Sequence, residues 1–181
     1  ILESARTLFD TQGFKKSTIR AVASHAQIGL GTIYKHFDNK NSLLAAAFYD
    51  DLVMLFDQAI ESVPENASIK DQLIHVAGFN YRYYTSRPKL SREYLTHIIF
   101  VKGVWANKIE LFEKRYVRII TGLIQAAQDR KEIRKEQDCH LVTLCFIADY
   151  FLVLMELFIR GNTNDPEKML DFLRKLIDQT I

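Results

Sequence analysis

Apolar residues recur every three to four positions along almost the whole chain, which is the spacing of an amphipathic α-helix. No segment shows the strict alternation of a half-buried strand. The pattern predicts an all-α protein with about nine helices. These helices are expected at about residues 1–12, 18–25, 30–36, 40–62, 68–86, 89–101, 104–129, 137–160 and 166–180.

Residues that favour helix ends lie between these segments. Gly13 is expected to end the first helix, Ser17 to cap the second and Asn39 to cap the fourth. Gly161 and Asn162 are expected to end the eighth. The chain has only 7 Gly and 3 Pro, so the connections between helices must be few and short.

The segments 18–25 and 30–36 are separated by a tight connection, which is the layout of a helix-turn-helix unit. On the second segment, Leu30, Ile33 and Phe37 share one face. The opposite face carries hydrogen-bond donors, one methyl group and a glycine. Such a helix fits the major groove of DNA, where donors meet phosphates and base edges.

The charge of the chain is modestly asymmetric. Residues 1–45 carry six Lys and Arg against three Asp and Glu, a net charge of +3, and the remainder carries 18 against 19, a net charge of −1. The positive end is therefore the end that contains the helix-turn-helix pattern, as a polyanion-binding surface requires.

The run from Gly31 to Lys40, followed by Leu43 and Leu44, reads GTIYKHFDNK and resembles the signature GT-hydrophobic-Y-x-HF-x-x-K-x-x-L of the TetR/AcrR family of bacterial transcriptional regulators. The preceding residues 9–23 resemble the family's upstream pattern LF-x-x-x-GF-x-x-TT-x-x-x-IA. The resemblance is specific over about 45 residues. Beyond them the chain matches only the family's general plan of helices.

The resemblance implies a helix-turn-helix DNA-binding domain at residues 1–45 and an effector-binding and dimerisation domain at residues 46–181. It implies a dimer that binds palindromic operator DNA, represses transcription and is released by a small hydrophobic effector. Thr18 and Lys40 would contact phosphate. The full set of implied DNA-binding residues is Ser17, Thr18, Gly31, Thr32, Tyr34, Lys35, His36 and Lys40.

Three positions depart from the family pattern. Gln27 stands where the family usually has Gly, so the turn must accept a side chain, at positive φ. Gly29 replaces a capping Ser, and Ala21 replaces a common Asp. A helical ligand-sensing dimer without DNA binding therefore stays open as an alternative, and a DNA-binding assay separates the two.

The predicted helices after residue 68 carry several aromatic and amide side chains on their inner faces. Together they favour an apolar cavity with a few polar anchors, the usual character of a small-molecule site; the alternative is that they only fill the core. Positive charge is scarce there, which favours an uncharged or cationic aromatic or aliphatic effector over a phosphorylated metabolite. The candidate ligand-binding residues are Asn80, Tyr84, Trp105, Phe112, Tyr116, Phe146 and Tyr150.

Residues 141–159 are almost wholly apolar and nearly long enough to span a bilayer. Asp149 and Glu156 argue against a membrane, since each would cost about 2.5–3.5 kcal/mol at its centre. A helix of this kind is better placed between its own core and a partner subunit. The pattern therefore predicts a homodimer through the eighth and ninth helices, with Leu173 on the seam.

Enzyme and metal chemistry find no support in the residues. Cys139 and His140 are adjacent, so on a helix they point about 100° apart and do not pair. No two histidines are spaced i, i+4 as a helical metal pair requires. We therefore expect no catalysis, cofactor or metal, and two free thiols in a reducing cytoplasm. The chain opens at Ile1 inside a helical pattern, from which we expect a preceding segment.

Overall fold

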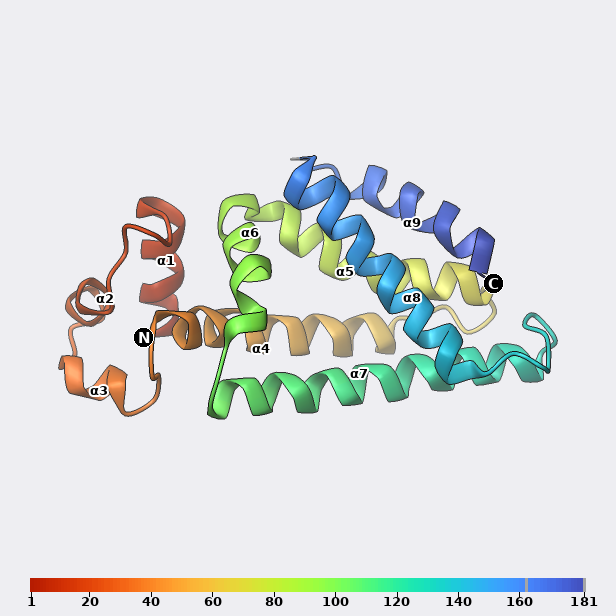
Figure 1. The fold of residues 1–181 in the computed structure, drawn as a ribbon, viewed down its shortest axis with the longest axis horizontal. Coiled ribbons are helices and arrows are strands. Elements are labelled where there is room, and N and C mark those ends of the chain that lie inside the picture. The colour runs from red at the N-terminus through yellow and green to blue at the C-terminus, as the bar shows by residue number, and fades with distance from the viewer. Residues whose placement is uncertain (162, 181) are drawn as a thin grey trace. The chain divides into compact units, whose positions relative to one another are not determined.

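Helices are the only regular elements in the described part of the chain. The computed structural model describes residues 1–161 and 163–180. Its elements are α1 (Leu2–Gln12), α2 (Ile19–His25), α3 (Leu30–Tyr34), α4 (Lys40–Glu61), α5 (Ile69–Ser86), α6 (Pro88–His97), the 3-10 segment η1 (Ile98–Phe100), α7 (Val104–Asp129), α8 (Cys139–Val153), the π-helical segment η2 (Leu154–Arg160) and α9 (Pro166–Thr180) (Figure 1). The all-α prediction is confirmed.

The chain divides into two compact units. The first unit comprises residues 1–54 and 87–110, and the second unit comprises residues 55–86 and 111–181. α4 and α7 therefore each begin in the first unit and end in the second. These are units of packing; the functional division at residue 45 stays a prediction.

The helix ends follow the expected residues with one exception. Gly13 ends α1 at φ 83°, a conformation that glycine adopts readily. The Asn39 side chain accepts a hydrogen bond from Ser42 N at 2.9 Å, which confirms it as the cap of α4. Thr18 caps α2 by accepting from Ala21 N at 3.1 Å, so the prediction that Ser17 caps this helix is wrong.

The sixth and eighth predicted helices are each two elements. α6 ends at His97, and a single 3-10 turn follows it. α8 begins after Asp138, whose carboxylate accepts from the backbone N–H groups of His140 and Leu141. The remainder of the eighth predicted helix, after Val153, is the wider π-helical segment η2. η2 ends at Gly161; Asn162, the other residue expected there, lies outside the described residues.

The helix that continues from α8 through η2 is long and apolar enough to cross a bilayer, judged by length and composition alone. The core helix of a soluble protein meets the same criterion. Asp149 and Glu156 lie within it, and an ionisable group at mid-membrane is costly.

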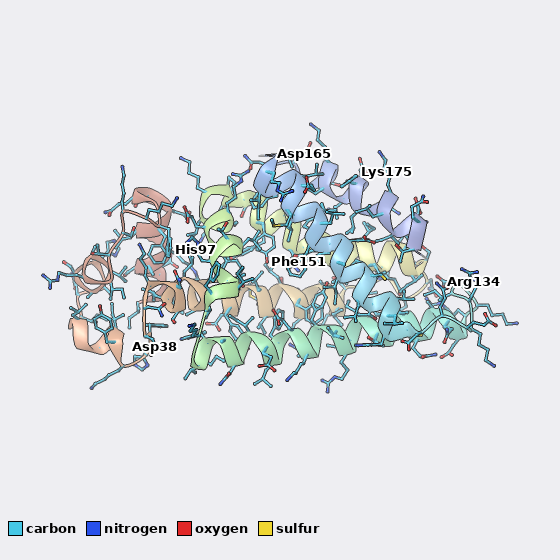
Figure 2. All side chains as sticks on the ribbon, in the orientation of Figure 1. Asp38, His97, Arg134, Phe151, Asp165 and Lys175 are labelled. Carbon is cyan, nitrogen blue, oxygen red and sulfur yellow. The ribbon has the colours of Figure 1, made fainter. Side chains whose placement is uncertain are left out.

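In the first unit, α1 to α4 bury Phe9, Val22, Ile33 and Phe48 around one core. Full burial of such side chains stabilises a fold by about 1.5–3 kcal/mol each. α6 belongs to this core, because Tyr94 stacks on Phe48 with ring centroids 4.3 Å apart. A second contact joins Phe14 and His97 at 5.1 Å; His97 is labelled on α6 in Figure 2.

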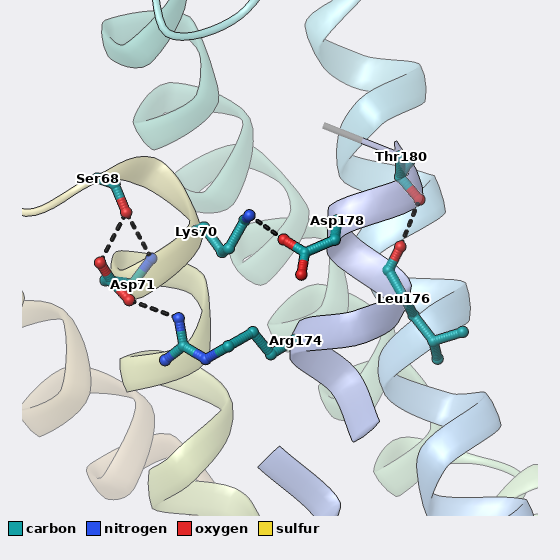
Figure 3. Close-up of polar contacts among 7 residues, drawn as sticks. All are labelled: Ser68, Lys70, Asp71, Arg174, Leu176, Asp178 and Thr180. Atoms are coloured by element: carbon teal, nitrogen blue, oxygen red, sulfur yellow. Dashed lines mark hydrogen bonds and ion pairs between the residues drawn. The ribbon is translucent and has the colours of Figure 1, made fainter. Parts of the chain in front are cut away.

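In the second unit, α5, α8 and α9 pack against one another. The apolar stripe of α9, with Met169, Leu173 and Ile177, is buried in this core. The predicted place of Leu173 on a dimer seam is therefore wrong, because its own subunit already covers it. Ion pairs from α5 to α9 line the edge of this packing: Lys70 with Asp178, and Arg174 with Asp71 at 2.7 Å (Figure 3).

Candidate nucleic-acid interface and ligand-binding interior

α3 has one buried face and one exposed face. Ile33 is fully buried, and Phe37, just after the helix, is nearly so. The opposite face is at the surface, with the Tyr34 side chain 52% exposed. The side chains of Thr32, Lys35 and His36 are exposed beside it. α3 thus presents donors and an aromatic ring to the outside while its apolar face anchors it.

The turn before α3 accepts a side chain in a glycine-like conformation. Gln27 has φ 54°, as its departure from the family pattern requires. The chain is held there by Ile28 N, which donates to Ala23 O at 3.0 Å. Gly29 begins α3 without a side-chain cap. The turn is therefore formed in spite of both substitutions.

Gly31 leaves open space on the outer face of α3. No atom lies within 4 Å of the position that a Cβ would occupy there. Since nothing inside the protein requires the missing side chain, the space it leaves lies on the solvent side. A backbone exposed in this way permits close approach of a ligand such as a DNA strand.

Ser17 and Lys40 hold the fold from inside the first unit. The buried hydroxyl of Ser17 donates to Leu8 O at 3.1 Å and Gly13 O at 2.9 Å. Lys40 Nζ donates to Phe14 O at 2.7 Å and Ser17 O at 3.1 Å. The implied DNA contact by the Ser17 side chain is corrected to a structural role, because its hydroxyl is buried and occupied.

Lys40 has little capacity left for a phosphate. A third, longer bond reaches Lys15 O at 3.4 Å, and the ammonium lies 4.3 Å from the centroid of the Phe14 ring. Partial burial lowers the pKa of Lys40 from its ordinary value. An ammonium has three N–H donors, so binding a phosphate would require one of these carbonyls to be released.

Trp105 lies in the first unit, apart from the other candidate ligand-binding residues. Its indole Nε1 donates to His36 O at 3.2 Å, and its ring stacks on Phe37 with centroids 5.8 Å apart. The contacts that the structure gives Trp105 are thus with the residues that follow α3, and its expected ligand-binding role stays a prediction. The helical pattern could not show these contacts, because the partners are 69 residues apart in sequence.

The remaining six candidates are all in the second unit, where they meet a group of buried tyrosines. Tyr81, which the sequence pattern did not single out, stacks on Tyr150 at 5.0 Å and donates to Tyr150 O at 3.0 Å. The Tyr84 and Tyr150 side chains are hydrogen-bonded to each other. Burial raises the pKa of Tyr84 and of Tyr116 far above the ordinary value for a phenol, so both stay neutral.

Two of the candidates keep polar atoms without partners among the described residues. Asn80 Oδ1 and the Tyr116 hydroxyl are buried and make no hydrogen bond there. Tyr116 packs on Phe56 at 4.7 Å, and Phe112 meets the same ring at 5.8 Å. A buried polar atom without a partner costs about 1–3 kcal/mol. The interior therefore gains stability when a small molecule or a water molecule supplies the missing partner.

Phe146 is buried on α8 and adds apolar surface to the same unit. After burial, the nearby Tyr84 phenol is the second cause that raises the pKa of Tyr116. The core of the second unit thus combines mostly apolar side chains with a few neutral hydrogen-bonding groups. Among the described residues, no group of three or more His, Cys, Asp and Glu could hold a metal ion.

One known protein family matches the N-terminal part of the chain. The family model of bacterial regulatory proteins of the tetR family matches residues 1–47. The chain is 23% identical over 141 residues to the fatty acid metabolism regulator protein of Bacillus subtilis, covering 78% of this chain and 73% of that protein. It is 24% identical over 179 residues to the transcriptional repressor KstR of Mycobacterium tuberculosis, covering 98% of this chain and 78% of that protein.

Among solved structures, the regulator FadR from Bacillus subtilis in complex with stearoyl-CoA matches with a TM-score of 0.75 at 18% identity, covering 99% of this chain and 97% of that chain. A likeness at this identity concerns the fold alone. The helix-turn-helix geometry and the family match over the same residues point in one direction: residues 1–47 form a domain of the tetR family of bacterial regulatory proteins, and the chain as a whole is similar to a transcriptional repressor.

Proposed function

We propose that the protein binds palindromic operator DNA as a homodimer, with α3 in the major groove, and represses transcription until an effector releases it. The observation that carries the proposal is the two-faced α3, with Ile33 buried and Thr32, Tyr34, Lys35 and His36 exposed. A helix held by its apolar face and free on its polar face suits a major groove about 12 Å wide.

Other residues of the interface have distinct roles in this proposal. Thr18 is exposed at the start of α2, where its hydroxyl oxygen accepts from Ala21 N and its O–H can donate to a phosphate. Gly31 allows the DNA backbone to approach α3 closely. Lys40 acts through the fold, by fixing the connection between α1 and α2. Residues 1–45 would thus form the reading surface.

The test is binding to a duplex that the protein itself selects from a random library. Affinity should fall steeply with salt, because phosphate contacts dominate it. Lys35→Ala should weaken binding and relax sequence preference, whereas the control Lys175→Ala, an exposed lysine of the second unit, should leave both unchanged. A protein that selects no sequence at low salt would instead be the ligand-sensing dimer without DNA binding.

We propose further that the effector carries a long acyl chain, held in the interior of the second unit. The apolar lining with Phe112, Phe146 and the neutral tyrosines suits such a chain. The names of two relatives, a fatty acid metabolism regulator and a FadR bound to stearoyl-CoA, support it. The unpartnered Asn80 and Tyr116 would bind the polar end or a polar substituent of the chain.

The effector test compares stearoyl-CoA, stearate and coenzyme A alone, each added to the complex with DNA. Release by stearate and stearoyl-CoA, but not by coenzyme A, would indicate that the protein recognises the acyl chain of the effector. Because stearate and stearoyl-CoA are both anions, this outcome would overturn the expectation of an uncharged or cationic effector. Release by stearoyl-CoA alone would show that the nucleotide is read as well. No release by any of the three would contradict the proposal. The proposal includes binding without turnover, which unchanged stearoyl-CoA after incubation would show.

The homodimer is proposed to form mainly through α8. Its exposed face carries a continuous apolar stripe at helical spacing, and Phe151 lies on it (Figure 2). α9 would contribute its half-buried Phe172 and Leu176 at the edge, since its main stripe is already buried. A partner subunit covers such a face better than lipid does, because Asp149 lies on the same helix. The dimer would act in the bacterial cytoplasm, where its DNA is. The stripe comprises Leu141, Leu144, Phe151 and Leu152 of α8 and continues at Met155 of η2.

A further inference from the structure

Trp105 joins the start of α7 to the end of α3 inside the first unit. Its Nε1 donates to the backbone oxygen of His36 at 3.2 Å. Its ring stacks on the side chain of Phe37, with centroids 5.8 Å apart and planes inclined by 20°. One side chain thus holds a backbone atom and a core side chain of two consecutive residues. His36 and Phe37 directly follow α3, which ends at Tyr34, so both contacts fix the C-terminal side of α3 to α7.

The indole is itself held from two other directions. Lys108, one turn further along α7, places its ammonium 4.2 Å from the centroid of the Trp105 ring. Tyr49 of α4 meets the ring edge to face at 5.9 Å. An aromatic ring with a cation and a second ring against it has little freedom to turn. Trp105 therefore has a fixed orientation in which to hold α3.

A second close approach joins the same two segments. Gly103 has φ 69°, and a Cβ built there would lie 2.8 Å from Asp38 Oδ2, on the residue after Phe37. Figure 2 labels Asp38 on the connection that follows α3. Any side chain at position 103 would displace the carboxylate and would be strained at this φ. The positive φ therefore favours glycine at position 103, and the loop before α7 passes close to the Asp38 side chain after α3.

α3 needs support of this kind because it is short. It has five residues, Leu30–Tyr34, and a helix of that length is not stable through its own hydrogen bonds. Base reading requires side chains to be held within about 0.5 Å of the productive position. The buried Ile33 anchors the middle of α3, and the contacts of Trp105 fix its C-terminal end.

We propose that Trp105 is a positioning residue for DNA reading: by fixing the end of α3 to α7, it makes sequence-specific binding depend on a helix outside residues 1–47. The proposal rests on DNA binding through α3. It implies that residues 1–47, although they match the family model, do not form a complete reading unit. It also makes α7, which continues into the second unit, a physical connection between the two units.

The test measures the ratio of affinities for the selected duplex and for an unrelated duplex of equal length, in the full-length dimer. Trp105→Ala should lower affinity for the selected duplex at least about tenfold while binding to the unrelated duplex stays unchanged. Trp105→Phe keeps the ring and loses one hydrogen bond, so a fall of about threefold is expected. Val104→Ala, an exposed neighbour, is the matched control and should retain the wild-type ratio.

A general loss of stability would lower both affinities together, so the ratio separates positioning from folding. If Trp105→Ala does not fold, as judged by circular dichroism, Trp105→Phe decides. A wild-type ratio in the folded Trp105 variants would overturn the inference and leave the proposed function intact. A wild-type protein that does not distinguish the two duplexes would overturn both.

Discussion

The two units differ in charge and in how completely their buried polar groups are satisfied. The first unit carries eleven Lys and Arg against seven Asp and Glu, a net charge of +4, whereas the second carries 13 against 15, a net charge of −2. A positive unit attracts a polyanion and a slightly negative one does not. The charge of the whole chain, +2, conceals this difference.

The two units also differ in the hydrogen bonds of their buried and half-buried polar side chains. In the first unit, the buried Ser17 hydroxyl and the half-buried Lys40 ammonium are bonded to backbone carbonyls, which fixes the connection between α1 and α2. In the second unit, Asn80 and Tyr116 point polar atoms into the core without partners among the described residues. Among the described residues, the buried side-chain atoms without a hydrogen-bond partner are the Ser91 hydroxyl in the first unit, and Gln72 Oε1, Asn80 Oδ1 and the Tyr116 hydroxyl in the second. A surface that reads DNA gains from rigidity, whereas an interior that binds a ligand gains from unsatisfied atoms.

The largest effect is expected from a charge on the exposed stripe of the second unit. Phe151→Asp places a carboxylate in the proposed apolar dimer interface, so the protein should sediment as a monomer at micromolar concentration. Affinity for the operator should then fall at least about 100-fold, because the second half-site no longer contributes. Leu111→Asp changes a comparably exposed leucine of the same unit outside α8 and is the control. A dimeric Phe151→Asp protein would contradict the α8 interface.

Replacing Lys40 is expected to have a smaller effect. Whether stability or the salt dependence of DNA affinity changes shows whether Lys40 supports the fold or contacts a phosphate. Lys40→Ala should lower the free energy of unfolding by about 1.5–3 kcal/mol, because the hydrogen bonds of a charged donor are removed. The slope of log affinity against log salt should stay unchanged. Lys35→Ala should show the opposite: unchanged stability and a slope reduced by about 0.9 for each phosphate that the lysine no longer neutralises. A reduced slope for Lys40→Ala would restore its implied phosphate contact.

The next prediction compares equivalent polar-to-apolar changes in the two units. Ser17→Ala should destabilise the protein by about 1 kcal/mol, because Leu8 O and Gly13 O lose their donor. Asn80→Leu should stabilise it by about 1 kcal/mol without effector, because a buried acceptor without a partner is removed. Urea unfolding measures both. Destabilisation by Asn80→Leu would show that Asn80 is satisfied in solution.

The smallest effect concerns the pH dependence of the α5–α9 edge in Figure 3. The hydrogen bond from Arg174 lowers the pKa of Asp71 below its ordinary value of 3.8. A carboxyl whose pKa is lower in the folded protein than in the unfolded chain stabilises the fold at pH above the unfolded-state pKa. This stabilisation is lost as the pH falls through the folded-state pKa. The thermal midpoint should therefore fall less below pH 4 in Arg174→Gln than in the wild type. An equal fall of the thermal midpoint in the variant and the wild type would show that the Arg174–Asp71 pair contributes nothing to stability.

Much of the fold followed from local pattern. Helical periodicity placed all the helices, and the cap at Asn39 and the positive φ of Gln27 were both expected from the residues and the signature. These features depend on neighbours a few positions away, so the sequence contains their cause. The exposed and buried faces of α3 followed for the same reason.

The errors have one physical origin, which is that long-range packing decides what a local pattern leaves open. Helical spacing could not show that Leu173 packs inside its own subunit, or that the Ser17 hydroxyl lies under α1. Trp105 has the spacing of a core or ligand-binding residue, and only the tertiary structure brings it to His36. Tyr81 became notable only when α8 supplied Tyr150 as its partner.

The sequence by itself determined the helices, the turn before α3, the faces of α3 and the family, because periodicity, capping and the signature are properties of short segments. The tertiary structure decided which apolar stripes stay exposed, which polar groups stay without partners and which lysine supports the fold instead of facing solvent. Those properties depend on which distant side chains meet. In this protein, such contacts join Trp105 to His36 and leave Asn80 Oδ1 and the Tyr116 hydroxyl without a hydrogen-bond partner among the described residues.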